Sequence, residues 1–317
     1  MPDPHVVVVV LNWCDEEMSR ACLRSLEAVD DFPLTILLVD NGSPDGSGER
    51  LREAFPHLDY IQTGSNLGYT GGNNRGIEWA LEREADYVLI LNNDALVEPG
   101  AIRRLVDTAA EADQPVGGVV PKILFHDEPD RIWFGGGSFS ALKGLGLHWR
   151  EGETDQPETD EEAREITFMT GACILLSAPA LRRVGGFDED FFAYVEDADL
   201  SLRLRKGGYS LVYEPRARVL HDAPPPGTPP TPFQIRQRDR NRRRVMRKHF
   251  RLPERLPFLI RFYLTRAVLL ARYLASGDGP RARALLEGAG LPEKEALPPK
   301  GRRPDPEGRR REAERAD

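Results

Sequence analysis

The sequence predicts an α/β fold in which a mostly parallel central sheet is flanked by helices, followed by a helical C-terminal extension. Three continuous apolar runs indicate the sheet, residues 6–11, 34–39 and 87–91. Because these runs do not alternate with polar residues, both faces of each strand should be buried, as in a parallel sheet covered by helices. The order of strands and helices predicts right-handed β-α-β crossovers.

Each predicted helix of the first half is marked by one apolar stripe at helical spacing. The third of them follows Pro99, a residue that suits a first helical turn. The stripes consist of Met18, Cys22, Leu26 and Val29; of Ile77, Ala80 and Leu81; and of Ile102, Leu105, Val106 and Ala109.

The second half of the chain is less regular. Residues 150–165 contain eight acids and little apolar content, which predicts a mobile surface loop. The remaining predicted elements are strands at 116–125, 168–177 and 210–213, and helices at 180–184 and 196–206.

The charge distribution limits the partners of the protein. The net charge is −8, yet residues 234–272 hold 13 Lys and Arg against two acids, so an acidic body carries one basic segment. We expect no nucleic-acid partner, because this segment contains no recognised binding module. Residues 256–275 are apolar but include three arginines, each costing about 2.5–3.5 kcal/mol at a membrane centre, so they should not span a membrane.

Cysteine usage and the N-terminus indicate a cytoplasmic protein. Cys14, Cys22 and Cys173 are odd in number and have no C-x-x-C spacing. This excludes a disulfide scaffold and a thiolate zinc site and fits a reducing compartment. The N-terminus lacks the pattern of a signal peptide, and the run at 6–11 is too short to cross a bilayer.

Polar residues follow each of the three predicted strands of the first half. Asn12 ends the first strand, Asp40 the second, and Asn92-Asn93-Asp94 the third. In an open parallel sheet, ligands bind outside the carboxyl ends of the strands, so these side chains should lie along one rim. The alternative is that each only caps the following turn.

A glycine-rich segment runs from Asn66 to Gly76 and includes Gly68 and Asn73. Glycine at this density permits close backbone approach or positive φ. The segment matches neither the G-x-G-x-x-G dinucleotide fingerprint nor a P-loop. It is either a tight turn into a helix or part of a binding site, for which Asn66 and Asn73 would supply donors and acceptors.

Two further groups of residues have the chemistry of a reactive site. Asp94 with neighbouring amide oxygens is a hard-oxygen environment suited to Mg²⁺ or Mn²⁺, and His221 is a candidate imidazole ligand. Glu196 and Asp197 begin a predicted helix beside aromatic residues, where an apolar wall would raise the pKa of a general base. The alternatives are a structural histidine and two carboxylates that simply favour a helix N-terminus.

Taken in order along residues 6–221, these motifs resemble the inverting glycosyltransferases of family 2 with the GT-A fold, especially the bacterial rhamnosyltransferase-like branch. The resemblance rests on a short series of motifs: Val-Val-Leu-Asn12-Trp, Val39-Asp40-Asn-Gly-Ser43, Asn66-Leu-Gly-Tyr-x-Gly-Gly-x-Asn-x-Gly76, Leu-Asn92-Asn-Asp94, Thr170-Gly171-Ala, and Gly-Gly-Phe-Asp188 running into Glu196-Asp197-x-Asp199-Leu-x-x-Arg203. The ordered series is far more specific than any one motif.

The resemblance implies a role for each group of residues. Asp40 would bind the nucleotide base or ribose, and Asp94, in the position of the family's D-x-D motif, would hold a divalent metal. Asn92 replaces the first acid of that motif, which makes His221 more important as a second ligand. Asp197 of the E-D motif, with Glu196 beside it, would be the general base. The donor pocket would also include Asn12, Asn66, Gly68, Asn73, Asn92 and Asn93, and the acceptor side would include Trp133, Thr170 and Gly171.

The implied activity is metal-assisted, inverting transfer of a sugar from a nucleotide-diphosphate sugar, either dTDP-rhamnose or a UDP-sugar, to a glycan or lipid-linked acceptor in cell-surface polysaccharide synthesis. One alternative is a catalytically silent GT-A-like scaffold, which Asn92 alone supports. A nucleotidyltransferase is less favoured, because the segment from Asn12 to Glu17 is acidic where that class needs a basic phosphate-binding loop. A dehydrogenase lacks its fingerprint.

The resemblance and the composition together suggest how the chain is divided. A catalytic domain is expected at 1–223, with a nucleotide-binding half at about 1–120 and an acceptor half at about 121–223. A proline-rich connector at 224–232 leads to a basic helical region at 233–290, and 291–317 should be a disordered tail. Residues 234–274 either contact an anionic membrane surface, making the protein peripheral, or cover the catalytic domain. The sequence specifies no oligomeric state.

Overall fold

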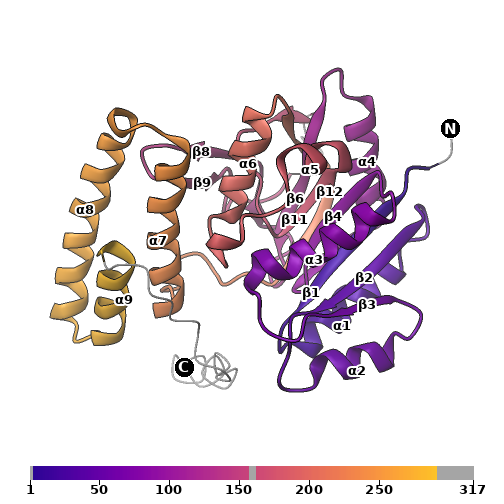
Figure 1. Ribbon diagram of the computed structural model, residues 1–317, viewed down its shortest axis with the longest axis horizontal. Helices are drawn as coiled ribbons and strands as arrows, with labels where there is room; N and C mark the ends of the chain where they lie inside the picture. Colours follow the sequence, from indigo (N-terminus) through magenta and orange to yellow (C-terminus); the bar gives the residue numbers. More distant parts are fainter. Residues whose placement is uncertain (1–2, 157–161, 291–317) are drawn as a thin grey trace.

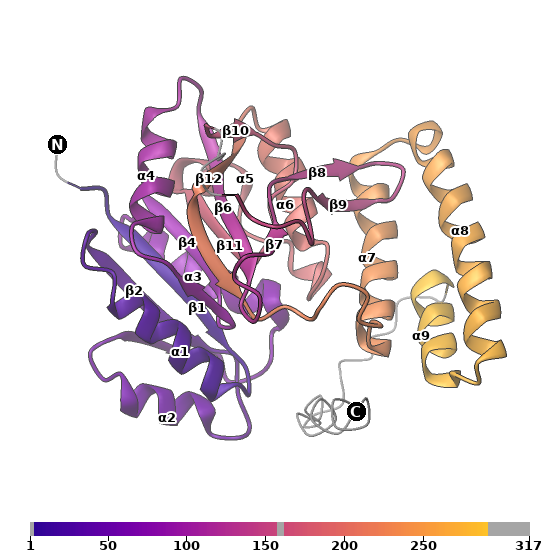
Figure 2. The same cartoon turned by 180° about the vertical axis from the view of Figure 1, so that it is seen from behind.

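A computed structural model describes residues 3–156 and 162–290 of the chain, so the predicted disordered tail at 291–317 lies outside the described residues. One mixed sheet with helices on both faces forms the larger part (Figure 1). Three helices from the C-terminal part of the chain, α7, α8 and α9, stand together at one side of it (Figures 1 and 2).

The main sheet has the strand order β10-β12-β6-β11-β4-β1-β2-β3, with β5 paired to β12 and β7 paired to β6. Strand β1 runs parallel to β2 and β4, as predicted, whereas β11 runs antiparallel to both β4 and β6. The strands of this sheet are β1 Val6–Asn12, β2 Leu34–Asp40, β3 Asp59–Gln62, β4 Tyr87–Asn92, β5 Ala95–Val97, β6 Val116–Phe125, β7 Ile132–Phe134, β10 Arg164–Glu165, β11 Cys173–Ser177 and β12 Ser210–His221. A separate hairpin consists of β8 Gly137–Ser140 and β9 Leu145–His148.

The predicted apolar stripes belong to helices that cover the sheet. Helix α3 lies on one face and helices α1 and α4 on the other (Figures 1 and 2). The first five valines of β1 are fully buried between them, which explains the continuous apolar run. The helices of this part are α1 Glu16–Glu27, α2 Ser47–Ala54, α3 Gly68–Glu82, α4 Ala101–Glu111, α5 Ala178–Val184 and α6 Glu196–Lys206, with a 3-10 turn, η2, at Glu189–Phe191.

Several expectations about local structure were wrong or incomplete. The strand expected at 168–177 forms only over Cys173–Ser177, and the one expected at 210–213 continues to His221. Strand β3 was not predicted, because it is only four residues long and no residue of it is fully buried. The glycine-rich segment is not a turn before a helix, since α3 already begins at Gly68.

The acidic segment at 150–165 was predicted to be a mobile loop, and its described residues contradict this. The carboxylate of Asp155 is buried and paired with Lys122 Nζ at 2.8 Å and with Arg218 Nη1 at 2.6 Å. Residues 164–165 form β10 at the edge of the sheet. The high acid count was misleading because buried Lys122 and partly exposed Arg218 compensate Asp155. Residues 157–161 of the segment lie outside the described residues.

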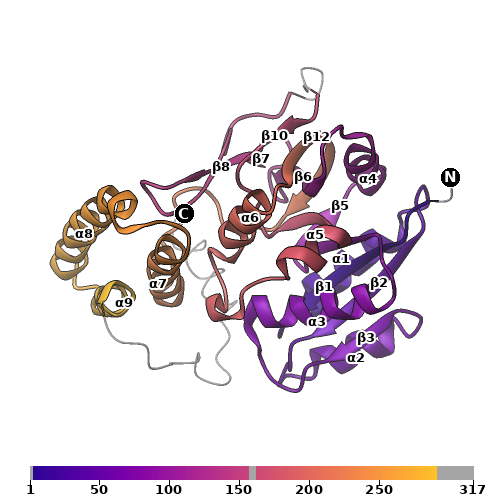
Figure 3. The same ribbon diagram turned by 45° about the horizontal axis from the view of Figure 1, so that its top comes forward.

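The basic region after the proline-rich connector folds into α7 Pro232–His249, α8 Leu252–Ala275 and α9 Gly279–Gly290. Helix α7 begins with a capping box between Thr231 and Gln234, and it packs on α6 on one side and on α9 on the other. Helix α8 is the outermost of the three, away from the sheet (Figures 1 and 3). Within the described residues, no helix is long and apolar enough to cross a membrane.

Candidate active site

The carboxyl ends of three neighbouring strands bring the predicted donor residues together. In the register of the sheet, Asn12 at the end of β1 lies opposite Asp40 of β2, and Leu11 lies opposite Asn92 of β4. Because parallel strands end at the same edge, the polar residues that follow them share one rim. This juxtaposition is the one that the apolar runs predicted.

Asp40 is fully buried at this rim and its carboxylate is held by protein donors. Oδ1 accepts hydrogen bonds from Asn12 Nδ2 at 2.9 Å and from Ser43 Oγ at 2.5 Å, and Oδ2 accepts one from Gln62 Nε2 at 2.5 Å. A side chain at Gly48 would place a Cβ 2.2 Å from the Asp40 carboxyl carbon, so glycine is needed there. Asp40 is therefore rigidly oriented before any ligand binds.

A chain of hydrogen bonds connects Asp40 with the loop after β4. Asn93 Nδ2 donates to Ser19 Oγ at 2.9 Å, Ser19 Oγ donates to Asn12 Oδ1 at 2.8 Å, and Asn12 donates in turn to Asp40. Ser19 is fully buried in α1. Sequence reasoning missed Ser19, because one serine inside an amphipathic helix gives no signal of a polar partner on the next element.

Asn66, Gly68 and Asn73 lie at the start of α3. Asn66 Oδ1 accepts from the Gly68 amide at 2.8 Å, and Asn73 Nδ2 donates to the Tyr69 carbonyl at 2.9 Å. Gly68 has φ +75°, and a Cβ there would lie 2.5 Å from the ring of Phe192. The glycine thus allows the loop before α6 to pack against the start of α3. None of these three lines the pocket described next, among the residues that the structure describes.

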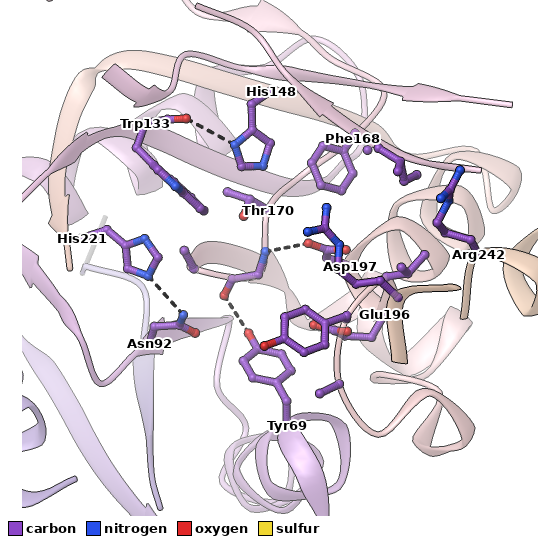
Figure 4. Close-up of a pocket in the computed structure, with 18 residues that line it drawn as sticks. Tyr69, Asn92, Trp133, His148, Phe168, Thr170, Glu196, Asp197, His221 and Arg242 are labelled. Carbon is purple, nitrogen blue, oxygen red and sulfur yellow. Dashed lines mark hydrogen bonds between the residues drawn. The ribbon is translucent and has the colours of Figure 1, made fainter. Parts of the chain in front are cut away.

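A cavity of about 440 Å³ opens beside this rim (Figure 4). It brings together residues from distant parts of the sequence that were predicted separately. The predicted residues that line it are Asn92, Trp133, Thr170, Gly171, Glu196, Asp197 and His221. Tyr69, His148, Phe168, Arg238 and Arg242, which were not predicted, also line it.

Asp197 contributes a carboxylate to the lining of the cavity. Its Oδ2 accepts from the Gly171 amide at 3.3 Å and its Oδ1 from the Ala198 amide at 2.8 Å, which fixes the side chain at the start of α6 (Figure 4). Burial raises the pKa of Asp197 to about 6, although these amides and Arg238 oppose the rise. A carboxylate with this pKa can accept a proton near neutral pH.

Glu196, the neighbour of Asp197, is buried and its Oε2 has no hydrogen-bond partner among the described residues. Burial, and then the charge of Asp197, raise the pKa of Glu196 well above its usual range. The two carboxyls therefore differ: burial and the neighbouring charge favour the protonated form of Glu196, whereas backbone amides and Arg238 favour the ionised form of Asp197.

An aromatic wall faces these carboxyls across the cavity. Trp133 packs edge-on against His148 and His221, with ring centroids 4.6 Å and 4.5 Å apart, and Phe168 continues the wall (Figure 4). Burial lowers the pKa of His148 to about 4, so this imidazole is neutral. Apolar rings beside a few fixed polar groups are the usual lining of a small-molecule site.

Asp94 and His221 form a corner that could hold a divalent metal. His221 Nε2 lies 3.1 Å from Asp94 Oδ1, and this oxygen, although buried, accepts no hydrogen bond within the described ranges. Adjacent ligands of an octahedral ion with bonds of 2.0–2.1 Å are about 3 Å apart, so the two atoms fit one Mg²⁺ or Mn²⁺. No group of three or more His, Cys, Asp or Glu in the described residues could hold a metal, so the other ligands would have to come from substrate and water.

Helix α7 holds the loop before Glu196 in place through Asn241, a residue that was not predicted from the sequence. Asn241 is fully buried, and its Nδ2 donates to the carbonyls of Phe191, Ala193 and Tyr194 at 2.8, 2.9 and 2.8 Å. The loop it holds includes Tyr194 and Val195 at φ +68° and +71°, a conformation that costs a non-glycine residue about 1–3 kcal/mol. The strained loop leads directly into Glu196 and Asp197.

A buried ion cluster fastens α7 to α6. Asp199 has no exposed side-chain surface and contacts Arg203 at 2.7 Å, Lys248 at 2.8 Å and His249 at 2.7 Å. Burial alone would raise the pKa of Asp199, but His249, Lys248 and Arg203 outweigh it and hold the pKa at about 2. Two elements from opposite sides of the connector are thus joined two residues after Asp197.

An α/β sheet whose strand ends carry Asp40 and Asp94, next to a pocket lined by paired carboxyls, is the arrangement expected of a glycosyltransferase of the GT-A type. The chain belongs to glycosyl transferase family 2, whose family model matches residues 5–185.

Curated relatives and solved structures agree with this family. The chain is 32% identical to an N-acetylglucosaminyl-diphospho-decaprenol L-rhamnosyltransferase of Mycobacterium tuberculosis, over 68% of this chain and 75% of the relative. It is 25% identical to the rhamnosyltransferase WbbL of Escherichia coli, over 69% of this chain and 83% of the relative.

Two solved structures share the fold. GalNAc-T7 with UDP, GalNAc and Mn²⁺ superposes with a TM-score of 0.62 at 18% identity, over 78% of this chain and 48% of that one. The mannosyltransferase PcManGT of Pyrobaculum calidifontis, in complex with GDP-Man and Mn²⁺, gives 0.52 at 20% identity, over 90% and 80%.

Proposed function

We propose that the protein is an inverting glycosyltransferase that moves a sugar, rhamnose or another hexose, from a dTDP- or UDP-linked donor to a hydroxyl of a lipid-linked glycan in polysaccharide synthesis. The observation that carries the proposal is Asp197, a carboxylate of raised pKa in the same cavity as Asn92 and His221. The names of the rhamnosyltransferase relatives support the sugar and the lipid-diphosphate acceptor. The cysteine pattern supports a cytoplasmic location.

In the proposed mechanism, Asp197 accepts the proton of the acceptor hydroxyl while that oxygen attacks the anomeric carbon from the face opposite the leaving diphosphate, which inverts the configuration. The Gly171 amide keeps Asp197 aimed into the cavity. Glu196 stays protonated and adds no second charge. Trp133, Thr170 and Gly171 bind the acceptor, with Trp133 offering an aromatic face to a sugar ring.

On the donor side, Asp40 binds the nucleotide, with Asn12, Asn93, Asn66 and the start of α3 around it. Gln62 is exposed, and its side-chain amide donates a hydrogen bond to Asp40 Oδ2. When the nucleotide binds, a hydrogen-bond donor of its ribose or base would replace this amide. Asp94 and His221 hold the divalent metal, which when bound neutralises the charge that develops on the leaving diphosphate. The catalytic unit extends beyond the limit expected at residue 223 and includes α7, because Arg238 and Arg242 of α7 line the cavity.

The experiment incubates the full chain with dTDP-rhamnose, UDP-sugars or GDP-sugars and a short-chain polyprenyl-diphosphate-linked N-acetylglucosamine. We expect transfer from one donor with Mn²⁺, an inverted linkage by NMR, and loss of transfer with a chelator. Asp94→Ala should also abolish the Mn²⁺-dependent thermal shift in the presence of the nucleotide. The absence of both transfer and donor hydrolysis with every donor would contradict the proposal. Activity that a chelator does not reduce would contradict the metal role.

A further inference from the structure

Helix α8 carries an exposed apolar face along its whole length. Seven large apolar side chains of this helix are between 46% and 70% exposed: Leu252, Leu256, Ile260, Tyr263, Leu264, Val268 and Leu274. The helix has 24 residues, so the face is about 36 Å long. Isolated exposed apolar residues need no explanation, but a continuous patch of this kind marks an interaction surface.

The position of these residues around α8 shows that the face is not a by-product of packing. Phe258 and Phe262 are buried and hold α8 on the helices beneath it. At 100° per residue, Ile260 points to the opposite side of the helix, and the positions within about 80° of it are all Leu, Ile, Val, Tyr, Ala or Pro. No charged residue interrupts this face, and Ile260, Tyr263 and Leu264 with Leu259 line a shallow apolar hollow on it.

The charges that border the face are mostly positive, although Glu254 lies at the same edge as Arg261 and Arg272, about 120° from Ile260. The helix contains four arginines and one acid, Glu254, in a chain whose net charge is −8. Arg261 and Arg272 are exposed and lie about 100–120° from Ile260, at one edge of the face. Two copies of the helix placed face to face would bring like charges together, whereas anionic lipid headgroups would neutralise them.

We propose that the apolar face of α8 is a docking surface for an anionic membrane, with the helix lying in the plane of the interface and not crossing it. Its apolar side chains would enter the headgroup boundary while Arg261 and Arg272 contact lipid phosphates, which is the arrangement of interfacial amphipathic helices. Helix α8 is the outermost element at this end of the molecule, so no described part of the chain blocks the approach (Figures 1 and 3).

The place of α8 also explains how a lipid-linked acceptor would reach the cavity, a step that rests on the proposed function. Helix α7 lies between α8 and the catalytic domain (Figure 3) and contributes Arg238 and Arg242 to the lining of the cavity. A membrane seated on α8 would present the polar head of an acceptor on the α7 side of the cavity while its lipid chain stays in the bilayer.

Vesicle sedimentation of the full chain tests the docking without using activity. We compare phosphatidylcholine vesicles with vesicles that also contain phosphatidylglycerol, at low and high salt. The wild-type chain should bind the anionic vesicles, less at high salt. The double variant Ile260→Gln/Leu264→Gln should lower the partition coefficient by about tenfold or more, and the matched variant Ile260→Leu/Leu264→Ile should bind like the wild type.

A second pair of variants separates specific contacts from net charge. Arg261→Gln/Arg272→Gln should weaken binding to anionic vesicles, whereas Arg24→Gln/Arg104→Gln, an equal charge change at exposed positions on the catalytic domain, should not. The proposal would be overturned if the wild-type chain did not bind anionic vesicles at low salt. It would also be overturned if the Ile260→Gln/Leu264→Gln variant bound them as well as the wild type. A wild-type dimer in sedimentation velocity that the Ile260→Gln/Leu264→Gln variant abolishes would overturn it too, because the face would then belong to a second copy. A failed donor screen with intact vesicle binding would contradict the proposed function alone.

Discussion

Helices α7 and α8 come from one basic stretch of sequence, yet α7 buries polar residues against the rest of the protein and α8 exposes an apolar face. Helix α7 turns its polar residues inward: Asn241 and Asp239 are buried, and Arg242 lines the catalytic cavity. Helix α8 keeps Arg261 and Arg272 exposed beside an apolar face, whereas its Arg266 turns inward and pairs with Asp239. A high local count of Lys and Arg therefore does not specify a role, because the role depends on which surface each helix faces. Four predictions test this contrast.

The largest expected effect is on stability. Asp199→Asn keeps the shape of the side chain but leaves Lys248, His249 and Arg203 without their counter-charge, and it should lower the free energy of unfolding by about 3 kcal/mol at neutral pH. Because the folded-state pKa of Asp199 is held at about 2, below its ordinary value of about 3.9, the stabilisation is present above that ordinary value and is lost as the pH falls toward about 2.

Urea unfolding at a series of pH values measures the difference between wild type and Asp199→Asn. The two curves should be well separated at neutral pH and converge at strongly acidic pH. A difference that is the same at every pH would mean that the ion cluster does not join α6 to α7 as described.

The next effect is on turnover and comes from α7. Asn241→Asp is close in size but cannot donate to the carbonyls of Phe191, Ala193 and Tyr194, so the loop before Asp197 should lose its fixed position. We expect kcat to fall by about 10²-fold with little change in the KM of the donor, the usual effect of a small misplacement of a catalytic group. Steady-state kinetics on folded protein measures both. Equal losses in kcat and in donor affinity would indicate general damage and not mispositioning.

The third effect is a shift in pH dependence. In the proposed mechanism Asp197 must be ionised, so kcat/KM should rise as the pH increases through about 6 and then level off. The positive charge of Arg238 lowers the pKa of Asp197, so Arg238→Gln should move the rising limb to higher pH, while Arg238→Lys should leave it near its original place. A pH profile that is identical in the Gln variant and the wild type would show that Arg238 does not act on the base.

The smallest effect sharpens the contrast between the two helices. Ile260→Gln/Leu264→Gln on α8 should leave kcat on a water-soluble acceptor unchanged, because neither residue touches the cavity. The same variant should be slower with an acceptor embedded in anionic vesicles. An equal loss with both acceptors would mean that α8 supports the catalytic domain as α7 does.

The sequence was sufficient for the parts of the site that local patterns encode. Continuous apolar runs predicted buried parallel strands, and the polar residues after them, Asn12, Asp40 and Asn92, do share one rim. Asp197 and His221 line one cavity, as their motifs suggested. Their roles in donor binding, metal binding and catalysis remain predictions, as do the domain limits at 223 and 232.

The parts that the sequence did not predict depend on partners far away along the chain. From the sequence alone, Asn241 is a polar residue in a solvated basic helix. Its contact with the strained loop, which lies 46–50 residues earlier in the chain, is visible only in the fold. Asp155 stands in an acid-rich segment, and only its burial with Lys122 and Arg218 distinguishes it from its neighbours. In both cases the informative quantity is a contact, which local composition does not contain.

The central claim is that Asp197 removes the acceptor proton in the cavity beside Asp94 and His221. The most direct measurement is single-turnover transfer by Asp197→Asn with saturating donor and acceptor. We predict a rate about 10²–10⁴-fold below wild type, with unchanged donor affinity and an unchanged unfolding midpoint. A rate equal to that of the wild type would show that another group accepts the proton.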